Sequence, residues 1–209
     1  MTDSQQKNDK TNEQLNQEHK ERMQKTQKEV RERVKAAQEE RGTLIVITGN
    51  GKGKSTSGFG TVARTVGYDL KAAVVQFVKG TWPCGERDLL KKLGVPFHVM
   101  GTGFTWDTQD REKDIAAAQE AWKACTEHLK DPDLYLLLMD ELTYMLNYDY
   151  LDTEEVLNAL KNRPENMTVV ITGRGAPQAL IDIADTVSEV QPVKHAFEAG
   201  IKARKGIDW

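Results

Sequence analysis

Apolar residues are spread very unevenly along this chain of 209 residues. Residues 1–42 contain neither an aromatic residue nor a proline, and their apolar positions form only a thin stripe, made of Leu15, Met23, Val30, Val34 and Ala37. The first dozen residues have the polar composition of a disordered end. The stretch 13–40 consists mainly of Glu, Gln, Lys, Arg and Ala, which favour helix. The sequence therefore predicts a polar N-terminal arm over residues 1–42, with a disordered start followed by a helix.

The arm allows two interpretations. An isolated helix with so narrow an apolar stripe is marginal in water. The arm is either a solvated helix with a frayed start, or an amphipathic element that packs on a partner subunit or over an active site when a ligand binds.

From residue 43 onward, short apolar runs alternate with helical segments. Strands are expected at 43–48, 72–78, 95–100, 134–141, 167–175 and 184–190. Helices are expected after the first strand as far as Gly67, and at 87–93, 110–129 and 153–162. Uninterrupted apolar strands joined through helices are typical of a parallel sheet covered on both faces. With no internal repeat and no second core, the sequence predicts a single α/β domain over residues 43–209.

Composition narrows the range of partners. A formal net charge of −3 gives no reason to expect binding to nucleic acid or to an acidic membrane surface. The two cysteines, Cys84 and Cys125, lack metal-site spacing and fit a reducing compartment. No apolar run approaches the ~18 residues that span a bilayer, and the N-terminus does not have the pattern of a signal peptide. We therefore expect a soluble, cytoplasmic protein.

The stretch TGNGKGKST (48–56) follows the first strand and precedes a helix, which is the context of a phosphate-binding loop, or P-loop. Its glycines let backbone N–H groups converge on phosphate oxygens, and the helix start adds a positive dipole end. Lys54 is placed to reach phosphates, the Ser55 hydroxyl to ligate Mg²⁺, and Lys52 adds a second cation. The usual pattern G-x-x-x-x-G-K-[ST] has Gly where this chain has Thr48. A purely structural glycine turn is the weaker alternative.

The run LYLLLMDE (134–141) ends in two acids, Asp140 and Glu141. P-loop proteins place the carboxylate that holds Mg²⁺ at the tip of such a strand, although acids there also cap strands or start helices. Together the motifs predict a P-loop (RecA-like), mostly parallel sheet with helices on both faces, preceded by the helical arm, and a site for Mg²⁺ and a nucleotide. They leave four functions open: a kinase, an ATPase with Glu141 as base, an alkyl transfer at the ribose C5′ carbon, and a nucleotide-gated binding module.

Beyond the loop, the sequence resembles the corrinoid adenosyltransferases of cobalamin synthesis and salvage, over roughly residues 41–209 and loosely in the arm. The segments that carry the resemblance are TGNGKGKST, VVQFVKGTWPCGER (74–87), TGFTWDTQD (102–110), MDELTYMLNYDYL (139–151), VVITGRGAP (169–177), ADTVSEV (184–190) and PVKHAFEAGIKARKGIDW (192–209).

The resemblance implies an ATP:cob(I)alamin adenosyltransferase. Such an enzyme transfers the 5′-deoxyadenosyl group of ATP to Co(I) of a corrinoid and releases inorganic triphosphate. ATP is then expected to lie in the loop in the opposite orientation to that in ordinary P-loop proteins. Thr48, which departs from the usual P-loop pattern, fits the pattern of this family. The resemblance further implies Mg²⁺ (or Mn²⁺), a homodimer, a reduced flavoprotein as electron donor, and an arm that covers the corrinoid site.

Site residues are also implied by the resemblance. Phe104 and Trp106 match the aromatic residues that contact the corrinoid, although two aromatics in a loop also plug gaps in a core. Arg64 and Arg174 match positions near the nucleotide, with exposed surface arginines as the rival interpretation. The residues expected around ATP are Asn50, Gly51, Lys52, Gly53, Lys54, Ser55, Thr56, Arg64 and Arg174. Those expected in catalysis are Lys54, Glu141, Phe104 and Trp106, and those expected at the metal are Ser55, Glu141 and Asp140. None of the four histidines is assigned to cobalt.

Overall fold

The computed structural model describes residues 11–78, 83–101 and 110–208. The chain divides into two compact units, residues 1–40 and 41–209, and each is described by itself. In the described residues, no helix has both the length and the apolar character needed to cross a membrane.

The first unit contains the predicted helix, α1 (Asn12–Ala36). It begins with a capping box, in which Gln14 N donates to Thr11 Oγ1 (3.3 Å) and Thr11 N donates to Gln14 Oε1 (3.0 Å). No residue of α1 is buried. The helix ends four residues before the predicted limit, because the acids that follow, Glu39 and Glu40, are unfavourable at the negative end of a helix dipole. The predicted disordered start lies mainly in residues 1–10, outside the described residues.

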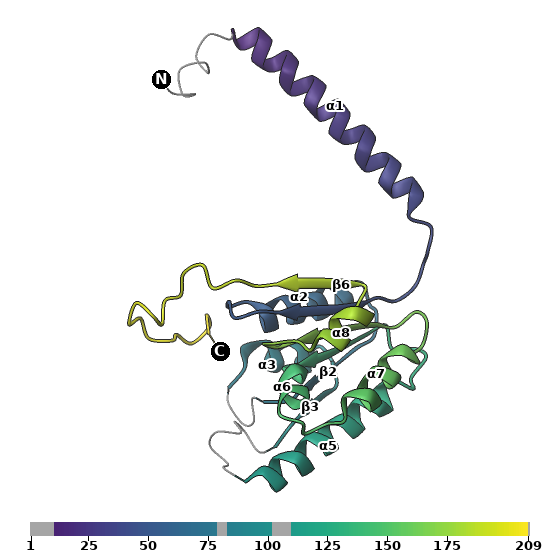
Figure 1. Ribbon diagram of the computed structural model, residues 1–209, viewed down its shortest axis with the longest axis vertical. Helices are drawn as coiled ribbons and strands as arrows, with labels where there is room; N and C mark the ends of the chain where they lie inside the picture. Colours follow the sequence, from purple (N-terminus) through teal and green to yellow (C-terminus); the bar gives the residue numbers. More distant parts are fainter. Residues whose placement is uncertain (1–10, 79–82, 102–109, 209) are drawn as a thin grey trace. The chain divides into compact units, whose positions relative to one another are not determined.

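In the second unit, the described residues form one six-stranded sheet in the order β3-β2-β4-β5-β1-β6, with every pairing parallel. Figure 1 shows this sheet with the helices packed around it. The strands are β1 (Leu44–Thr48), β2 (Ala72–Gln76), β3 (Phe97–Val99), β4 (Leu136–Asp140), β5 (Thr168–Thr172) and β6 (Thr186–Glu189). The helices are α2 (Lys54–Val66), α3 (Gly85–Lys92), α5 (Arg111–His128), α6 (Leu142–Asn147), α7 (Thr153–Lys161) and α8 (Gln178–Ile183). The α/β class and all six predicted strands are confirmed, whereas α6 and α8 were not predicted.

Alternate residues of the strands enter two separate cores. Leu137 and Met139 of β4 pack in the core that contains the buried faces of α5, α6, α7 and α8. Leu136 and Leu138 point to the other face, where α2 and α3 pack. The sheet is therefore covered by helices on both faces, which explains the uninterrupted apolar runs in the sequence.

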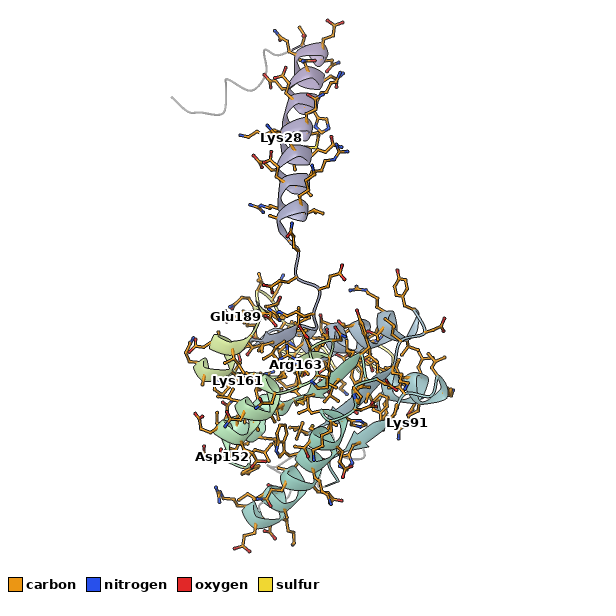
Figure 2. The ribbon with its side chains drawn as sticks, turned by 90° about the vertical axis from the view of Figure 1, so that its right-hand side faces the viewer. Lys28, Lys91, Asp152, Lys161, Arg163 and Glu189 are labelled. Carbon is orange, nitrogen blue, oxygen red and sulfur yellow. The ribbon has the colours of Figure 1, made fainter. Side chains whose placement is uncertain are left out.

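A cluster of charges ties the start of β1 to the start of β6. The Asp185 carboxylate accepts hydrogen bonds from Arg41 Nη2 (2.6 Å), Arg41 Nη1 (3.0 Å) and Leu44 N (2.8 Å). Arg163, labelled in Figure 2, approaches the same carboxylate at 3.6 Å. The hydrogen bonds from Arg41 and then from Leu44 hold the pKa of Asp185 at about 2. This cluster lies at the amino ends of the strands, which leaves the carboxyl ends of β1, β4 and β5 to form a site.

Candidate active site

The phosphate loop connects β1 to α2, and close packing explains two of its glycines. Gly51 N donates to Val190 O (2.7 Å), which brings the segment after β6 against the loop. A Cβ atom on Gly49 would lie 2.5 Å from Val190 O, and one on Gly51 would lie 2.7 Å from Gln191 O. Gly53 has φ +116° and directly precedes α2. The loop therefore needs glycine for close approach at the first two positions and for backbone conformation at the third.

Lys54 is the first residue of α2 and is buried. Its Nζ donates to Gly51 O across the loop (2.7 Å). Burial lowers the pKa of Lys54, while the nearby Glu141 carboxylate opposes that shift and Arg174 adds to it. The loop lysine, the strand-end acid and this arginine therefore share one electrostatic environment.

The two acids after β4 have different surroundings. Asp140 is fully buried, accepting from Thr172 Oγ1 (2.7 Å) and from Gln76 Nε2 (3.1 Å). The same Thr172 hydroxyl accepts from Glu141 N (3.0 Å). Glu141 has φ +64°, a conformation that costs about 1–3 kcal/mol for a non-glycine residue and is common at functional sites. Asp140 and Thr172 thus fix the backbone from which the Glu141 side chain projects.

Arg174 is carried by the loop after β5, and α6 holds that loop in place. Arg174 O accepts from Thr143 Oγ1 (2.8 Å) and from Asn147 Nδ2 (3.1 Å). Gly173 has φ +141°, and a Cβ atom there would collide with Thr143 Oγ1. The carboxyl ends of β4 and β5 therefore present Glu141 and Arg174 beside the phosphate loop.

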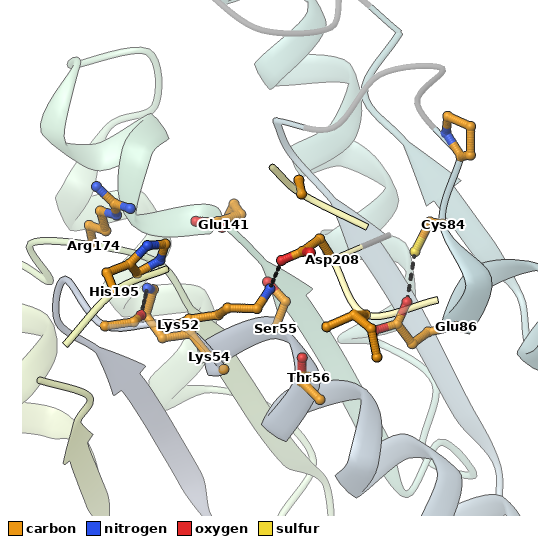
Figure 3. A pocket seen from close by; sticks show the side chains of 15 residues that line it. Lys52, Lys54, Ser55, Thr56, Cys84, Glu86, Glu141, Arg174, His195 and Asp208 are labelled. Carbon is orange, nitrogen blue, oxygen red and sulfur yellow. Dashed lines mark hydrogen bonds and ion pairs between the residues drawn. The ribbon is translucent and has the colours of Figure 1, made fainter. Parts of the chain in front are cut away.

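These elements enclose a cavity of about 380 Å³, seen from close by in Figure 3. The loop lines it from Gly51 to Thr56, and Glu141 and Arg174 lie at its side. The rest of its wall comes from two further segments, with Pro83, Cys84 and Glu86 at the start of α3 and His195, Ala203, Ile207 and Asp208 from the C-terminal segment.

Comparison with known proteins identifies the family. A family model described as ATP:corrinoid adenosyltransferase BtuR/CobO/CobP matches residues 40–209. The chain belongs to this family. It is a transferase that moves the adenosyl group of ATP to a corrinoid.

Curated relatives agree with this assignment over most of their length. The corrinoid adenosyltransferase of Escherichia coli (strain K12) is 56% identical over 191 residues, which cover 91% of this chain and 97% of that protein. Corrinoid adenosyltransferase CobA of Salmonella typhimurium is 58% identical over 193 residues, covering 90% and 98%. The corrinoid adenosyltransferase of Pseudomonas aeruginosa is 49% identical over 195 residues, covering 92% and 96%.

Most of the residues predicted for this adenosyltransferase from sequence come together in the cavity. The predicted residues that line it are Gly51, Lys52, Gly53, Lys54, Ser55, Thr56, Glu141 and Arg174. Asn50 is an exposed residue of the loop, Asp140 is buried at the end of β4, and Arg64 is exposed in the last turn of α2. None of these three lines the cavity. Phe104 and Trp106 lie outside the described residues.

Sequence reasoning assigned no role to the C-terminal residues that line the cavity or to those at the start of α3. Both groups lie in segments that carry the family resemblance, but the sequence alone did not place them beside the loop. Cys84, which had no predicted role, is buried, and its Sγ donates to Glu86 Oε2 (3.5 Å).

The cavity fits Mg²⁺ that arrives with a nucleotide. Among the described residues, no group of three or more His, Cys, Asp or Glu side chains is placed to hold a metal ion. The Ser55 hydroxyl and the Glu141 carboxylate nevertheless line the same cavity. Mg²⁺ is commonly held by one or two such oxygen ligands together with water and substrate phosphates, so this pair suits the ion.

Proposed function

We propose that the cavity binds the triphosphate of ATP at the loop and leaves the C5′ carbon open to Co(I) of the corrinoid. The observation that carries this proposal is the convergence of Lys52, Lys54 and Arg174 on one cavity with the glycine-rich loop. Three cations and the start of α2 favour a highly charged anion there.

In the proposed reaction, the electron pair of Co(I) forms the Co–C5′ bond while the C5′–O bond breaks. That bond's electrons leave with inorganic triphosphate, and cobalt becomes formally Co(III). Negative charge grows on the leaving group, so Lys52, Lys54 and Arg174 act by stabilising it. No proton moves in this step, so Glu141 does not act as a base.

We assign the metal to Ser55 and Glu141. Bound Mg²⁺ (or Mn²⁺) would neutralise charge on the triphosphate. Asp140 was predicted as a further ligand, but its carboxylate accepts hydrogen bonds inside the sheet. We therefore propose that Asp140 acts through Thr172 to orient Glu141.

The remaining assignments rest on the resemblance. Phe104 and Trp106 are proposed to contact the corrinoid, and Asn50 and Arg64 to contribute to ATP binding. A homodimer, a reduced flavoprotein as electron donor, a cytoplasmic location and an arm that covers the corrinoid site belong to the same set of proposals.

The test mixes the protein with Mg·ATP and chemically reduced cob(I)alamin, and follows the corrinoid spectrum and the phosphate products together. We expect loss of the Co(I) absorbance with matching amounts of adenosylcobalamin and inorganic triphosphate. Lys54→Ala should lower this rate strongly, and removing Mg²⁺ with a chelator should do the same. ADP and phosphate formed beside an unchanged corrinoid would contradict the proposal.

A further inference from the structure

The C-terminal segment, residues 190–208, follows β6 and passes along the phosphate loop. Asp208 Oδ1 lies 2.7 Å from Lys52 Nζ, an ion pair that Figure 3 shows as a dashed line. The carboxylate is held by its own turn, because Arg204 N donates to Asp208 Oδ2 (2.7 Å) and Asp208 N donates to Arg204 O (2.8 Å). The segment therefore presents a fixed anion to a lysine of the loop.

This ion pair involves one of the cations that we assign to the triphosphate. A carboxylate and a phosphate are similar partners for an ammonium group, and both side chains are partly exposed, Lys52 at 50% and Asp208 at 27%. The Lys52 hydrogen bond, followed by that of Arg204 N, lowers the pKa of Asp208. Asp208 is therefore charged at neutral pH. If Lys52 bound both anions at once, a carboxylate and a triphosphate would lie close together, which like charges disfavour.

We propose that Asp208 is a positioning residue that competes with the triphosphate chain for Lys52. Its carboxylate weakens the hold of the loop on ATP and on the inorganic triphosphate product, and it returns to Lys52 as the product leaves. The inference rests on the proposed function, since it requires phosphate binding at the loop.

The experiment measures the affinity of the full chain for inorganic triphosphate with Mg²⁺ by calorimetry. An exposed ion pair changes an equilibrium constant by up to about 5-fold, so D208N should bind triphosphate up to about 5-fold more tightly. Asp208→Glu keeps the charge and should restore the wild-type affinity. Asp133→Asn is the matched control, because it removes a carboxylate from another exposed pair, with Lys71 at 3.1 Å, and should leave the affinity unchanged.

A double-mutant cycle tests whether the effect passes through Lys52. Asp208→Asn should have little effect in a K52Q background. Equal or weaker binding by D208N, or an undiminished effect without Lys52, would overturn the inference. Failure of the proposed function would give a different result. The wild type would then not bind inorganic triphosphate, or Lys54→Ala would bind it as tightly as the wild type does.

A second measurement follows the product during turnover. D208N should show stronger inhibition by inorganic triphosphate than the wild type, and D208E should not. A residue that merely packs the C-terminal segment would not separate these two variants. Unchanged product inhibition in D208N would therefore also count against the inference.

Discussion

Replacing Thr172 by Val tests the connection between the core of the sheet and the position of Glu141. Thr172 is fully buried, and its hydroxyl donates to Asp140 Oδ1 (2.7 Å) and accepts from Glu141 N (3.0 Å). Valine has nearly the same shape, so the substitution removes both hydrogen bonds without leaving a cavity. A buried polar group that loses its partner costs about 1–3 kcal/mol. With two groups affected, we expect T172V to lose about 2–6 kcal/mol of unfolding free energy.

Thr172→Ser is the matched control, because it keeps the hydroxyl and removes only the methyl group that faces α2 at Gly58. Deleting a buried methyl costs about 1 kcal/mol. Urea unfolding of both variants measures the difference, and the adenosyl-transfer assay with increasing Mg²⁺ measures the effect on Glu141. We expect T172V to need more Mg²⁺ and to turn over more slowly than T172S. Equal stability and equal Mg²⁺ dependence of the two variants would refute the reasoning.

Three further perturbations test other parts of the molecule. Gly173→Ala places a side chain at φ +141° against Thr143. Thermal unfolding should therefore show a free energy of unfolding lower by about 1–3 kcal/mol or more. An unchanged melting temperature would contradict this account. The pKa of Asp185 is lowered from 3.8 to about 2. Its ionised form therefore adds about 1–2 kcal/mol to the free energy of unfolding, after a discount for partial exposure. This stabilisation should be complete above about pH 4 and disappear as the pH falls towards 2. Urea unfolding of the wild type and D185N across this range should show their difference closing at low pH, and a difference independent of pH would count against it. Deleting residues 1–40 should weaken corrinoid use and spare ATP binding, and corrinoid kinetics equal to those of the full chain would exclude the proposed role of the arm.

The strands and the loop were predictable because their signals are local. The central strands β1, β2, β4 and β5 are mostly apolar runs, and the glycines of the loop stand directly between such a run and a helix. The helices α6 and α8 gave no comparable signal, because each has only six residues and shows too little of the helical period. The segment LTYMLN continues the apolar character of β4, and only the left-handed conformation at Glu141 separates the two elements.

The site was predictable where residues lie at the ends of strands. Lys54, Glu141 and Arg174 follow β1, β4 and β5, and the carboxyl ends of parallel strands meet at one edge. Arg64 is different, because it lies ten residues beyond Lys54 on α2. At 1.5 Å per residue this is about 15 Å along the helix, which fits its absence from the cavity lining, and its role in ATP binding stays a prediction. The pair formed by Lys52 and Asp208 had no local signal, since the segment after β6 has no period that places it.

The structure explains why the loop has Thr48 where the usual pattern has glycine. Its side chain is buried at the end of β1, and its Oγ1 accepts a hydrogen bond from Ala176 N (3.1 Å). Ala176 lies two residues after Arg174, so this bond ties the phosphate loop to the loop that carries the arginine. A glycine at position 48 would lose the bond and leave the Arg174 loop held mainly by Thr143 and Asn147 of α6. The hydroxyl therefore helps to place the cation beside the loop lysines, and the distinctive residue acts by joining two parts of the site rather than by contacting phosphate itself.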